Sequence, residues 1–305
     1  MENFFGKPEY GPAQGAYSWQ HLTFVLSFIV AMIIIAILLG LKNKNKKDDI
    51  KNKVLIWSAF LINGFELFKI AFNIGASDDG MSWTRDLPLF LCSIQLIAIP
   101  MAAFCKGKLR EASLDFVFIF GILGSILGPV GAAQNYNAYP VLTFPNVVSS
   151  ITHSISGFAS LYIAISGMSS MKKGNIKYVF VILFGFCIAA YIANIIFDYN
   201  YMFLMNHDGT PYIIVYNLVN GNPVLYPILV VLLFVLYIVV FYFIYNYFKN
   251  KKSKRWKSFF LCKIYVLNNT KNKKYSIVIV GTDNMKKVLS ITTTKLKDSN
   301  IFWVS

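Results

Sequence analysis

Residues 21–41 read HLTFVLSFIVAMIIIAILLGL, and residues 42–53 after them read KNKNKKDDIKNK. The first stretch is long enough to cross a hydrocarbon core of about 30 Å as a helix, which takes about 20 apolar residues. The second stretch is rich in lysine, which marks the cytoplasmic side of a membrane protein. The pair therefore predicts a membrane-spanning helix that ends in the cytoplasm.

The composition of the whole chain agrees with this interpretation. Of its 305 residues, 56% are apolar or aromatic and 14% are charged, and the mean hydropathy is +0.54. A soluble domain carries charge on about a quarter of its residues. The balance excludes a disordered chain, a secreted disulfide scaffold and an ordinary cytosolic enzyme. An integral membrane protein remains.

Apolar runs predict an all-α membrane protein with seven transmembrane helices. The runs cover residues 21–41, 54–75, 87–105, 114–131, 146–168, 178–198 and 226–248. Asp86 with Pro88 at the start of the third run, and Thr143 with Pro145 before the fifth, predict helix starts with a capping residue and a proline in the first turn. The basic residues cluster in every second connection, while the loops 132–145 and 199–225 contain no lysine or arginine. The positive-inside rule places the N-terminus outside and the C-terminus in the cytoplasm.

Three parts follow from this topology: an extracellular segment over 1–20, a seven-helix domain over 21–248 and a basic tail over 249–305. The net charge of +15 then reflects this topology, because the basic residues mark the cytoplasmic side and can contact anionic lipid headgroups there. Nucleic-acid binding is not expected. The first run is read as a signal anchor, because it is too long for a signal peptide and lacks a basic segment before it. A cell membrane location is expected.

Polar residues inside four of the runs fall on single helix faces. A charged side chain at membrane depth costs roughly 2.5–3.5 kcal/mol, so such residues should face a cavity or one another. We expect them to surround a hydrated pocket. They are Asn63, Glu66, Lys69 and Asn73 in the second run, Cys92 and Gln95 in the third, Ser149, Thr152, His153, Ser156 and Ser160 in the fifth, and Cys187, Tyr191, Asn194 and Asp198 in the sixth.

Several of these residues have two interpretations. A buried cysteine is usually inert, but a base beside it would make Cys92 a nucleophile, and His153 is the candidate base. His153 could equally be a structural hydrogen-bonding residue between helices. Glu66 and Lys69 are read as an ion pair, a proton relay or a headgroup clamp. His21 is either interfacial or functional, whereas Gly124 and Gly128 form a small-xxx-small pattern that favours helix packing.

Other chemistries are not indicated. The four cysteines lack the spacing of a zinc site or a disulfide framework. The seventh run has no lysine for a retinal Schiff base, and no nucleotide-binding or metalloprotease motif occurs in a usable context. The sequence thus predicts no metal and no cofactor.

The motifs resemble those of the YwaF-like bacterial integral membrane proteins over residues 17–250. They are YSWQHLTF at 17–24, Glu66, DLPLFLCSIQL at 86–96, FGILGSILGPV at 120–130, ITHS at 151–154 and DYNYMFL at 198–204. That family is similar to a eukaryotic multi-spanning lipid acyltransferase with a catalytic cysteine in an LPL-x-LC context and a histidine two spans later. The matching residues are Cys92 and His153.

The resemblance implies acyl transfer from a phospholipid to a lysolipid or another acceptor through a thioester on Cys92. His153 would carry the proton, and Gln95 or nearby backbone donors would hold the oxyanion. Glu66, Lys69, Asn194, Asp198 and His21 are the candidate pocket residues. Two other classes stay open: a transporter or binding component for a small polar solute, and a structural or assembly protein whose polar stripes only join helices.

The tail departs from the resemblance. Its short apolar runs, YSIVIV at 275–280 and IFWVS at 301–305, predict weak strands between basic segments. About fifty residues are few for an independent core. We therefore expect a marginal β-rich appendage or a poorly ordered extension.

Overall fold

The computed structural model of the chain describes residues 12–76, 82–169, 171–260, 263–269, 274–280 and 291–292. The predicted strand at 301–305, Cys262 and most of the predicted extracellular segment lie outside the described residues. The chain divides into two units, Met1–Phe241 and Tyr242–Ser305, and helix α10 runs across the boundary.

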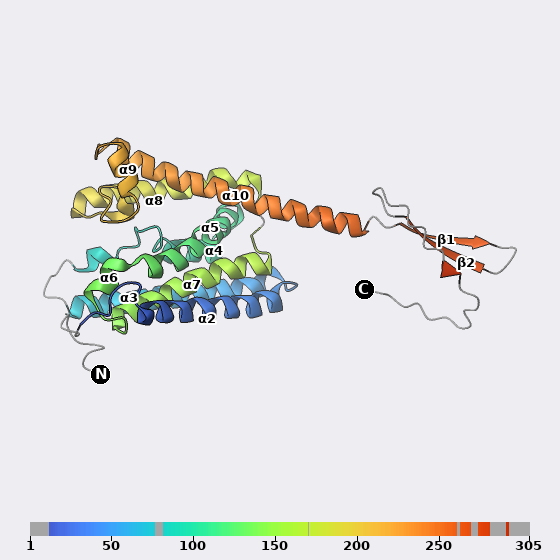
Figure 1. Cartoon of the computed structure of the whole chain (residues 1–305), viewed down its shortest axis with the longest axis horizontal. Coiled ribbons are helices and arrows are strands. Elements are labelled where there is room, and N and C mark those ends of the chain that lie inside the picture. The colour runs from blue at the N-terminus through green and yellow to red at the C-terminus, as the bar shows by residue number, and fades with distance from the viewer. Residues whose placement is uncertain are drawn as a thin grey trace. The chain divides into compact units, whose positions relative to one another are not determined.

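The first unit is a helical bundle. Its helices are α2 Trp19–Asn43, α3 Asp48–Ala76, α4 Gln95–Phe104, α5 Gly107–Gly131, α6 Ala133–Ala138, α7 Phe144–Ser166, α8 Ile176–Phe197, α9 Ile213–Leu218 and the first part of α10, Leu225–Phe260, with short 3₁₀ turns η1 Ser82–Asp86, η2 Lys173–Asn175 and η3 Tyr201–Phe203. Helices α4 and α5 lie between a layer of α2, α3 and α7 and a layer that contains α8 and α9 (Figure 1).

Helix α7 is at the centre of the packing, since it contacts α2, α3 and α5. Its start agrees with the sequence prediction: Thr143 is the N-cap, and Pro145 lies in the first turn. Its end is set by Gly167, which adopts a left-handed φ of 75° that lets the N–H of Met168 reach the carbonyl of Ile163 at 3.0 Å. Only glycine adopts this conformation at little cost.

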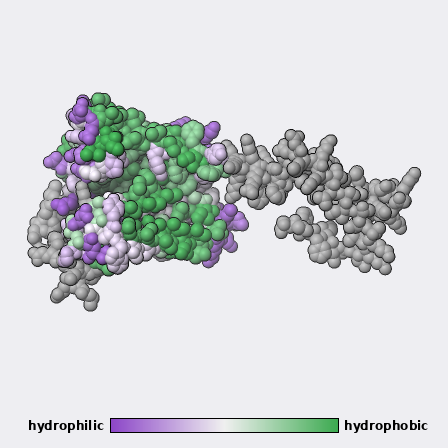
Figure 2. Space-filling view, in the orientation of Figure 1, coloured by the Kyte–Doolittle hydropathy of each residue, from purple (hydrophilic) through white to green (hydrophobic). Residues whose placement is uncertain are grey.

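The surface of the bundle is apolar over its middle. On the face in Figure 2, a broad hydrophobic area covers the helices, and hydrophilic residues gather at the two ends. Leu38, Leu67 and Ile196 are each more than 60% exposed. Soluble monomers rarely expose an apolar area of this extent, so the surface is that of a membrane protein.

Six helical segments among the described residues are long and apolar enough to cross a membrane. They are Trp19–Asn43, Asp48–Gly75, Gly107–Ala138, Phe144–Ser166, Lys173–Phe197 and Leu225–Lys249. These segments match six of the seven predicted spans. The remaining one, predicted over 87–105, contains only the shorter apolar helix α4.

The expected helix start at Asp86 and Pro88 is wrong, because α4 begins at Gln95 and turns occupy the residues before it. Ser93 explains part of this, since its hydroxyl accepts from the Phe90 N–H at 3.0 Å and donates to the Phe90 carbonyl at 3.1 Å. Such local bonds compete with the helical pattern. The ring of Phe90 also lies between those of Tyr201 and Phe203, with ring-centre distances of 5.5 and 5.9 Å, which holds the turn in place.

The second unit contains the end of α10 and an antiparallel sheet in the order β1-β2-β3. The strands are β1 Lys263–Asn269, β2 Lys274–Val280 and β3 Ile291–Thr292. Lys263 pairs with Val280, and Ser276 pairs with Thr292. Strand β2 covers the whole apolar run at 275–280.

Candidate functional site

A cavity of about 180 Å³ lies where the second half of α3, the turns before α4 and the first and middle turns of α7 meet. It is lined by four of the residues singled out from the sequence as site candidates, Glu66, Lys69, Cys92 and His153. Ser149, Thr152 and Ser156 of the α7 polar stripe also line it. We call it the reactive cavity. Two segments about 60 positions apart in the chain thus bring one thiol and one imidazole to the same space.

Cys92 lies in the turn that precedes α4 and is partly exposed. The first N–H groups before and within a helix have no intrahelical acceptor. Because no continuous helix covers 87–94, the N–H groups of Cys92 and Ser93 belong to the turn that carries the thiol.

His153 lies in the third turn of α7, on the same face as Ser149 and Ser156. Its ring is partly exposed and packs against Gly128 of α5, where a methyl group added to the glycine would lie 2.3 Å from Cε1. A neutral imidazole carries one N–H and one acceptor nitrogen. The acceptor nitrogen is the atom that a general base requires.

Helix α5 contacts both groups through glycines one turn apart. A methyl group added to Gly124 would lie 3.3 Å from Cα and Cβ of Cys92, and one added to Gly128 would lie 2.3 Å from Cε1 of His153. Positions four residues apart are separated by about 6 Å along a helix. Cys92 and His153 therefore lie against the same face of α5, within about one turn.

An ion network borders the cavity. The Lys69 ammonium lies 2.7 Å from Glu66 Oε1 and 3.2 Å from Asp86 Oδ1, and Asn73 donates to Asp86 Oδ2 at 2.8 Å. The three charged side chains are 10–14% exposed. The predicted pairing of Lys69 with Glu66 is confirmed, while Asp86, expected as a helix cap, instead joins η1 to α3. Charges at this depth are stable only when paired in this way.

His21 has a structural environment. Its ring is fully buried, its Nδ1 accepts from the Tyr17 N–H at 2.9 Å, and its Nε2 lies 3.1 Å from the Pro129 carbonyl. The ring also stacks on Tyr136 with centres 3.9 Å apart. Both nitrogens are thus satisfied, and the residue joins the start of α2 to the end of α5.

The other candidates lie away from the described lining of the reactive cavity. Gln95 is fully buried, and neither atom of its amide group has a partner among the described residues. Asn194 exchanges hydrogen bonds with Tyr201, accepting from its N–H at 2.6 Å and donating to its carbonyl at 3.1 Å. Asp198 ends α8 with a left-handed φ of 48°. These last two residues fix the connection after α8.

A second, apolar cavity of about 510 Å³ is formed by α8 and the start of α10. Cys187 and Tyr191 line it together with Phe184, Ile188, Pro227 and Leu232. The polar stripe expected along the sixth run is therefore divided, because Cys187 and Tyr191 face apolar side chains and Asn194 faces Tyr201.

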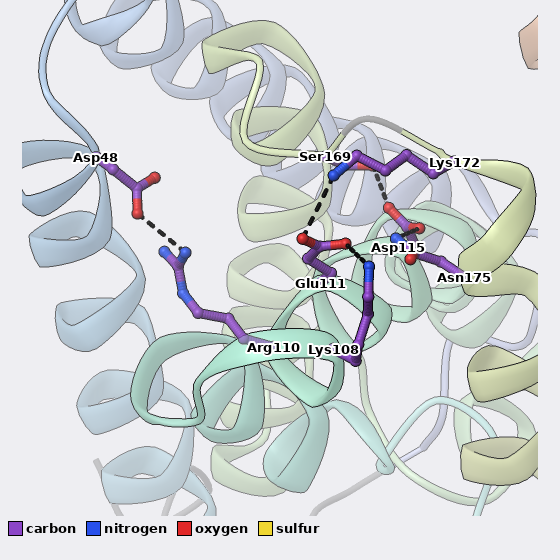
Figure 3. Close-up of polar contacts among 8 residues, drawn as sticks. All are labelled: Asp48, Lys108, Arg110, Glu111, Asp115, Ser169, Lys172 and Asn175. Atoms are coloured by element: carbon purple, nitrogen blue, oxygen red, sulfur yellow. Dashed lines mark hydrogen bonds and ion pairs between the residues drawn. The ribbon is translucent and has the colours of Figure 1, made fainter.

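A third polar group, which we call the Asp115 cluster, lies near the start of α5 and just after the end of α7 (Figure 3). Asp115 is 1% exposed, and its two oxygens accept from Ser169 Oγ at 2.6 Å and Asn175 Nδ2 at 3.0 Å. One turn earlier in α5, Glu111 contacts Lys108 and Lys172 at 3.4 and 3.3 Å, and Arg110 lies 2.9 Å from Asp48. The contacts of Ser169, Lys172 and Asn175 attach the connection between α7 and α8 to α5, and the Arg110–Asp48 pair attaches the start of α3.

Sequence reasoning missed Asp115 and the role of the two α5 glycines. A carboxyl group two residues into the fourth apolar run was a visible signal for Asp115. The described residues contain no group of three or more His, Cys, Asp or Glu side chains that could hold a metal ion.

Together, the helices, the apolar surface and the enclosed thiol and imidazole define a multi-pass helical membrane protein with a reactive cavity between its spans. Comparison with family models identifies it further. Residues 16–245 match the model of the TMEM164 family, which covers most of the chain, and the chain belongs to this family. No curated protein matches the chain, and no solved structure matches it either.

Proposed function

We propose that the protein is a lipid acyltransferase that uses Cys92 as nucleophile and His153 as general base. The observation that carries the proposal is the shared cavity, in which both side chains are partly exposed and lie against one face of α5. The resemblance to the multi-spanning Cys/His acyltransferase described above supports the same two residues. The substrate class follows from the surroundings, because a cavity between membrane spans is reached most directly by membrane lipids.

The chemistry proceeds in two balanced steps. His153 takes the proton from the Cys92 thiol, and the sulfur attacks the ester carbonyl carbon of a phospholipid. The carbon–sulfur bond forms, the carbon–oxygen bond breaks, and His153 returns the proton to the departing lysophospholipid hydroxyl. In the second step, an acceptor hydroxyl loses its proton to His153, and its oxygen attacks the thioester carbonyl carbon. The carbon–oxygen bond forms, the carbon–sulfur bond breaks, and His153 returns the proton to the Cys92 sulfur.

Several groups are available to stabilise the oxyanion of each tetrahedral intermediate. The N–H groups of Cys92 and Ser93 belong to the turn that carries the sulfur, and Lys69 also lines the cavity. A single well-placed donor contributes about 3–4 kcal/mol to such a step. Backbone donors therefore replace Gln95, whose amide does not line the cavity, as the proposed oxyanion ligands.

The size of the cavity limits what it holds. Pockets that enclose a whole small molecule span about 300–1,000 Å³, whereas the reactive cavity measures about 180 Å³. We infer that it holds the ester and the neighbouring polar part of the lipid, while the acyl chains lie along the apolar surface outside.

We further propose that the turns at 87–94 and α4 together form a broken third crossing. This gives seven passes of the cell membrane with the N-terminus outside and the reactive cavity in the outer half. A membrane-impermeant thiol reagent added to intact cells tests this placement. Labelling of Cys92 from outside supports it, and labelling only after permeabilisation overturns it.

The test of the activity is mass spectrometry of the purified chain after incubation with phospholipid. We expect a fatty-acyl mass on Cys92 that hydroxylamine removes and that is lost in Cys92→Ser and strongly reduced in His153→Ala. Cys105→Ser is the matched control, because Cys105 is also partly exposed but lies at the far end of α4. An unmodified Cys92 in folded protein under these conditions would rule out the proposal.

A second candidate is the binding of a small polar solute, favoured by the four charged residues Glu66, Lys69, Arg85 and Asp86 in a small cavity. A solute that binds the folded chain raises its unfolding temperature. A screen of small zwitterions and anions by thermal unfolding tests this candidate, and a flat response from every compound would eliminate it.

A further inference from the structure

Three glycines in α5 lie on the side of the helix that faces Cys92 and α7. A methyl group added to Gly121 would lie 2.7 Å from Cβ of Ser160, and one added to Gly124 would lie 3.3 Å from Cβ of Cys92. One added to Gly128 would lie 2.3, 2.7 and 2.9 Å from Cε1, Nδ1 and Nε2 of His153. Real Cβ atoms essentially never come within 3.0 Å of another heavy atom, as they would at 121 and 128, and the 3.3 Å at 124 is a tight contact. Helix α5 therefore has glycine where these neighbours need the space.

The contact at Gly128 differs in kind from an ordinary helix crossing. At Gly121, the neighbours are Cβ of Ser160 and the backbone carbonyl of Ser156, which are fixed parts of α7. At Gly128, the neighbour is the imidazole ring itself, three of whose atoms lie within 3 Å of the added carbon. A side chain at 128 would displace the ring directly.

Gly124 provides the second constraint, on the other reacting group. It lies one turn before Gly128, and a methyl group added there would lie 3.3 Å from both Cα and Cβ of Cys92. The missing side chain at Gly128 thus fixes where the imidazole lies, and the missing side chain at Gly124 fixes where the turn that carries the thiol lies.

We propose that Gly124 and Gly128 are positioning residues for the Cys92–His153 pair. Gly128 leaves the space that the imidazole occupies, and Gly124 leaves the space for the turn that carries the thiol. This inference rests on the proposed function. In a Ser-His-Asp triad, a carboxylate positions the imidazole, whereas here the surface of α5 has that part. Glu66 forms its ion pair with Lys69.

The same face of α5 also sets the distance between the two reacting groups. Gly124 lies next to Cα and Cβ of Cys92, so the turn that carries the thiol packs against the same helix as the His153 ring. A change at Gly128 should move His153 away from Cys92 without altering either residue. Misplacement of a reacting group by about 1 Å can lower a rate by about 100-fold.

The test compares Gly128→Ala with two controls on the same helix. Gly131→Ala is the neutral control, because nothing lies within 4 Å of a methyl group added there. Gly121→Ala is the steric control, since it crowds α7 at Ser160 rather than at the imidazole. Thermal unfolding of each variant separates a loss of packing from a loss of geometry.

Two readouts are used: the rate of acyl-thioester formation, and the rate of Cys92 alkylation by iodoacetamide between pH 6 and pH 9. We expect Gly128→Ala to slow acylation roughly 10- to 100-fold and to reproduce the alkylation pH profile of His153→Ala. The double variant Gly128→Ala/His153→Ala should be no slower than His153→Ala, because both changes remove the same base. Gly131→Ala and folded Gly121→Ala should keep the native pH profile.

The inference is overturned if folded Gly128→Ala acylates at the native rate with the native pH profile. It is equally overturned if its effect multiplies that of His153→Ala, since independent effects mean that the glycine does not act through the imidazole. The alkylation readout needs no lipid. If the native chain forms no thioester but Gly128→Ala and His153→Ala share an altered alkylation profile, acyl transfer fails while the positioning role stands.

Discussion

The reactive cavity and the Asp115 cluster are both polar groups inside an apolar bundle, yet they differ in what surrounds them. In the Asp115 cluster, the carboxyl group is 1% exposed, and both of its oxygens accept hydrogen bonds from side chains. In the reactive cavity, Cys92 and His153 are partly exposed and face open space. Both lie against α5, near its opposite ends.

The difference shows that a polar side chain within a membrane span can serve either the stability of the fold or the binding and reaction of a ligand. A buried polar group whose bonds are all made by protein stabilises one conformation and has little capacity left for a ligand. A polar group at the wall of a cavity keeps an atom available. The Asp115 cluster should therefore control stability with little effect on reactivity, and the cavity residues should do the reverse.

The largest expected effect is on chemistry at the cavity. Cys92→Ala should abolish acyl transfer, and His153→Ala should reduce it by about 10²–10⁴-fold, the usual contribution of a general base. Neither change should lower the unfolding temperature by more than a few degrees, because neither residue is fully buried. Turnover of a fluorescent phospholipid and thermal unfolding of the same samples check this prediction. Equal losses of stability and activity would contradict it.

The Asp115 cluster should give the opposite pattern. Asp115→Ala leaves the donors of Ser169 and Asn175 buried without their acceptor, at a cost of about 1–3 kcal/mol each. Asp115→Asn keeps one acceptor and should lose less. Thermal unfolding measures both, with the alkylation rate of Cys92 as the control. A change in that rate without a change in stability would show that the two regions are coupled.

Sequence patterns predicted most of the bundle, because a membrane span needs a long apolar run and such runs are visible in one dimension. The start of α7 at Thr143 and Pro145 was predicted for the same reason, since caps are local. The third span was not, because the break before Gln95 depends partly on the ring of Phe90 packing against Tyr201 and Phe203, far away in the chain.

The candidate site divides in the same way. Helical spacing placed Glu66 beside Lys69 and put Ser149, His153 and Ser156 on one face, and these residues share the cavity. Spacing could not show that Asn194 is held by Tyr201 or that His21 is tied to Pro129, because those partners come from tertiary packing. The glycines of α5 were read as packing, since only the fold reveals that their neighbours are Cys92 and His153.

Lys69 should affect both stability and reactivity, because it lines the reactive cavity and also forms ion pairs with Glu66 and Asp86. Removing one member of a buried pair costs about 3–5 kcal/mol, and the residual exposure of this network should reduce the loss to about 1–3 kcal/mol. Lys69→Met should also loosen η1, since it breaks the contact with Asp86. We expect a lower unfolding temperature together with slower acylation of Cys92. Glu66→Gln is the milder control, because it retains the contact between Lys69 and Asp86. Native acylation in the Lys69→Met variant would show that the ion network does not position Cys92.

The smallest effect is expected one turn from Asp115. Glu111 lies four residues earlier in α5 and contacts Lys108 and Lys172 at 3.4 and 3.3 Å, but its side chain is 36% exposed. Exposed ion pairs contribute about 0–1 kcal/mol, so Glu111→Ala should change the unfolding temperature little, and high salt should remove the difference.

Both carboxyl groups hold the same connection between α7 and α8, through Lys172 in the case of Glu111 and through Ser169 and Asn175 in the case of Asp115. If Glu111→Ala destabilised the chain as much as Asp115→Ala, attachment of that connection would be the determining factor. A small effect of Glu111→Ala beside a large one of Asp115→Ala would identify burial of a satisfied carboxyl group as the source of stability.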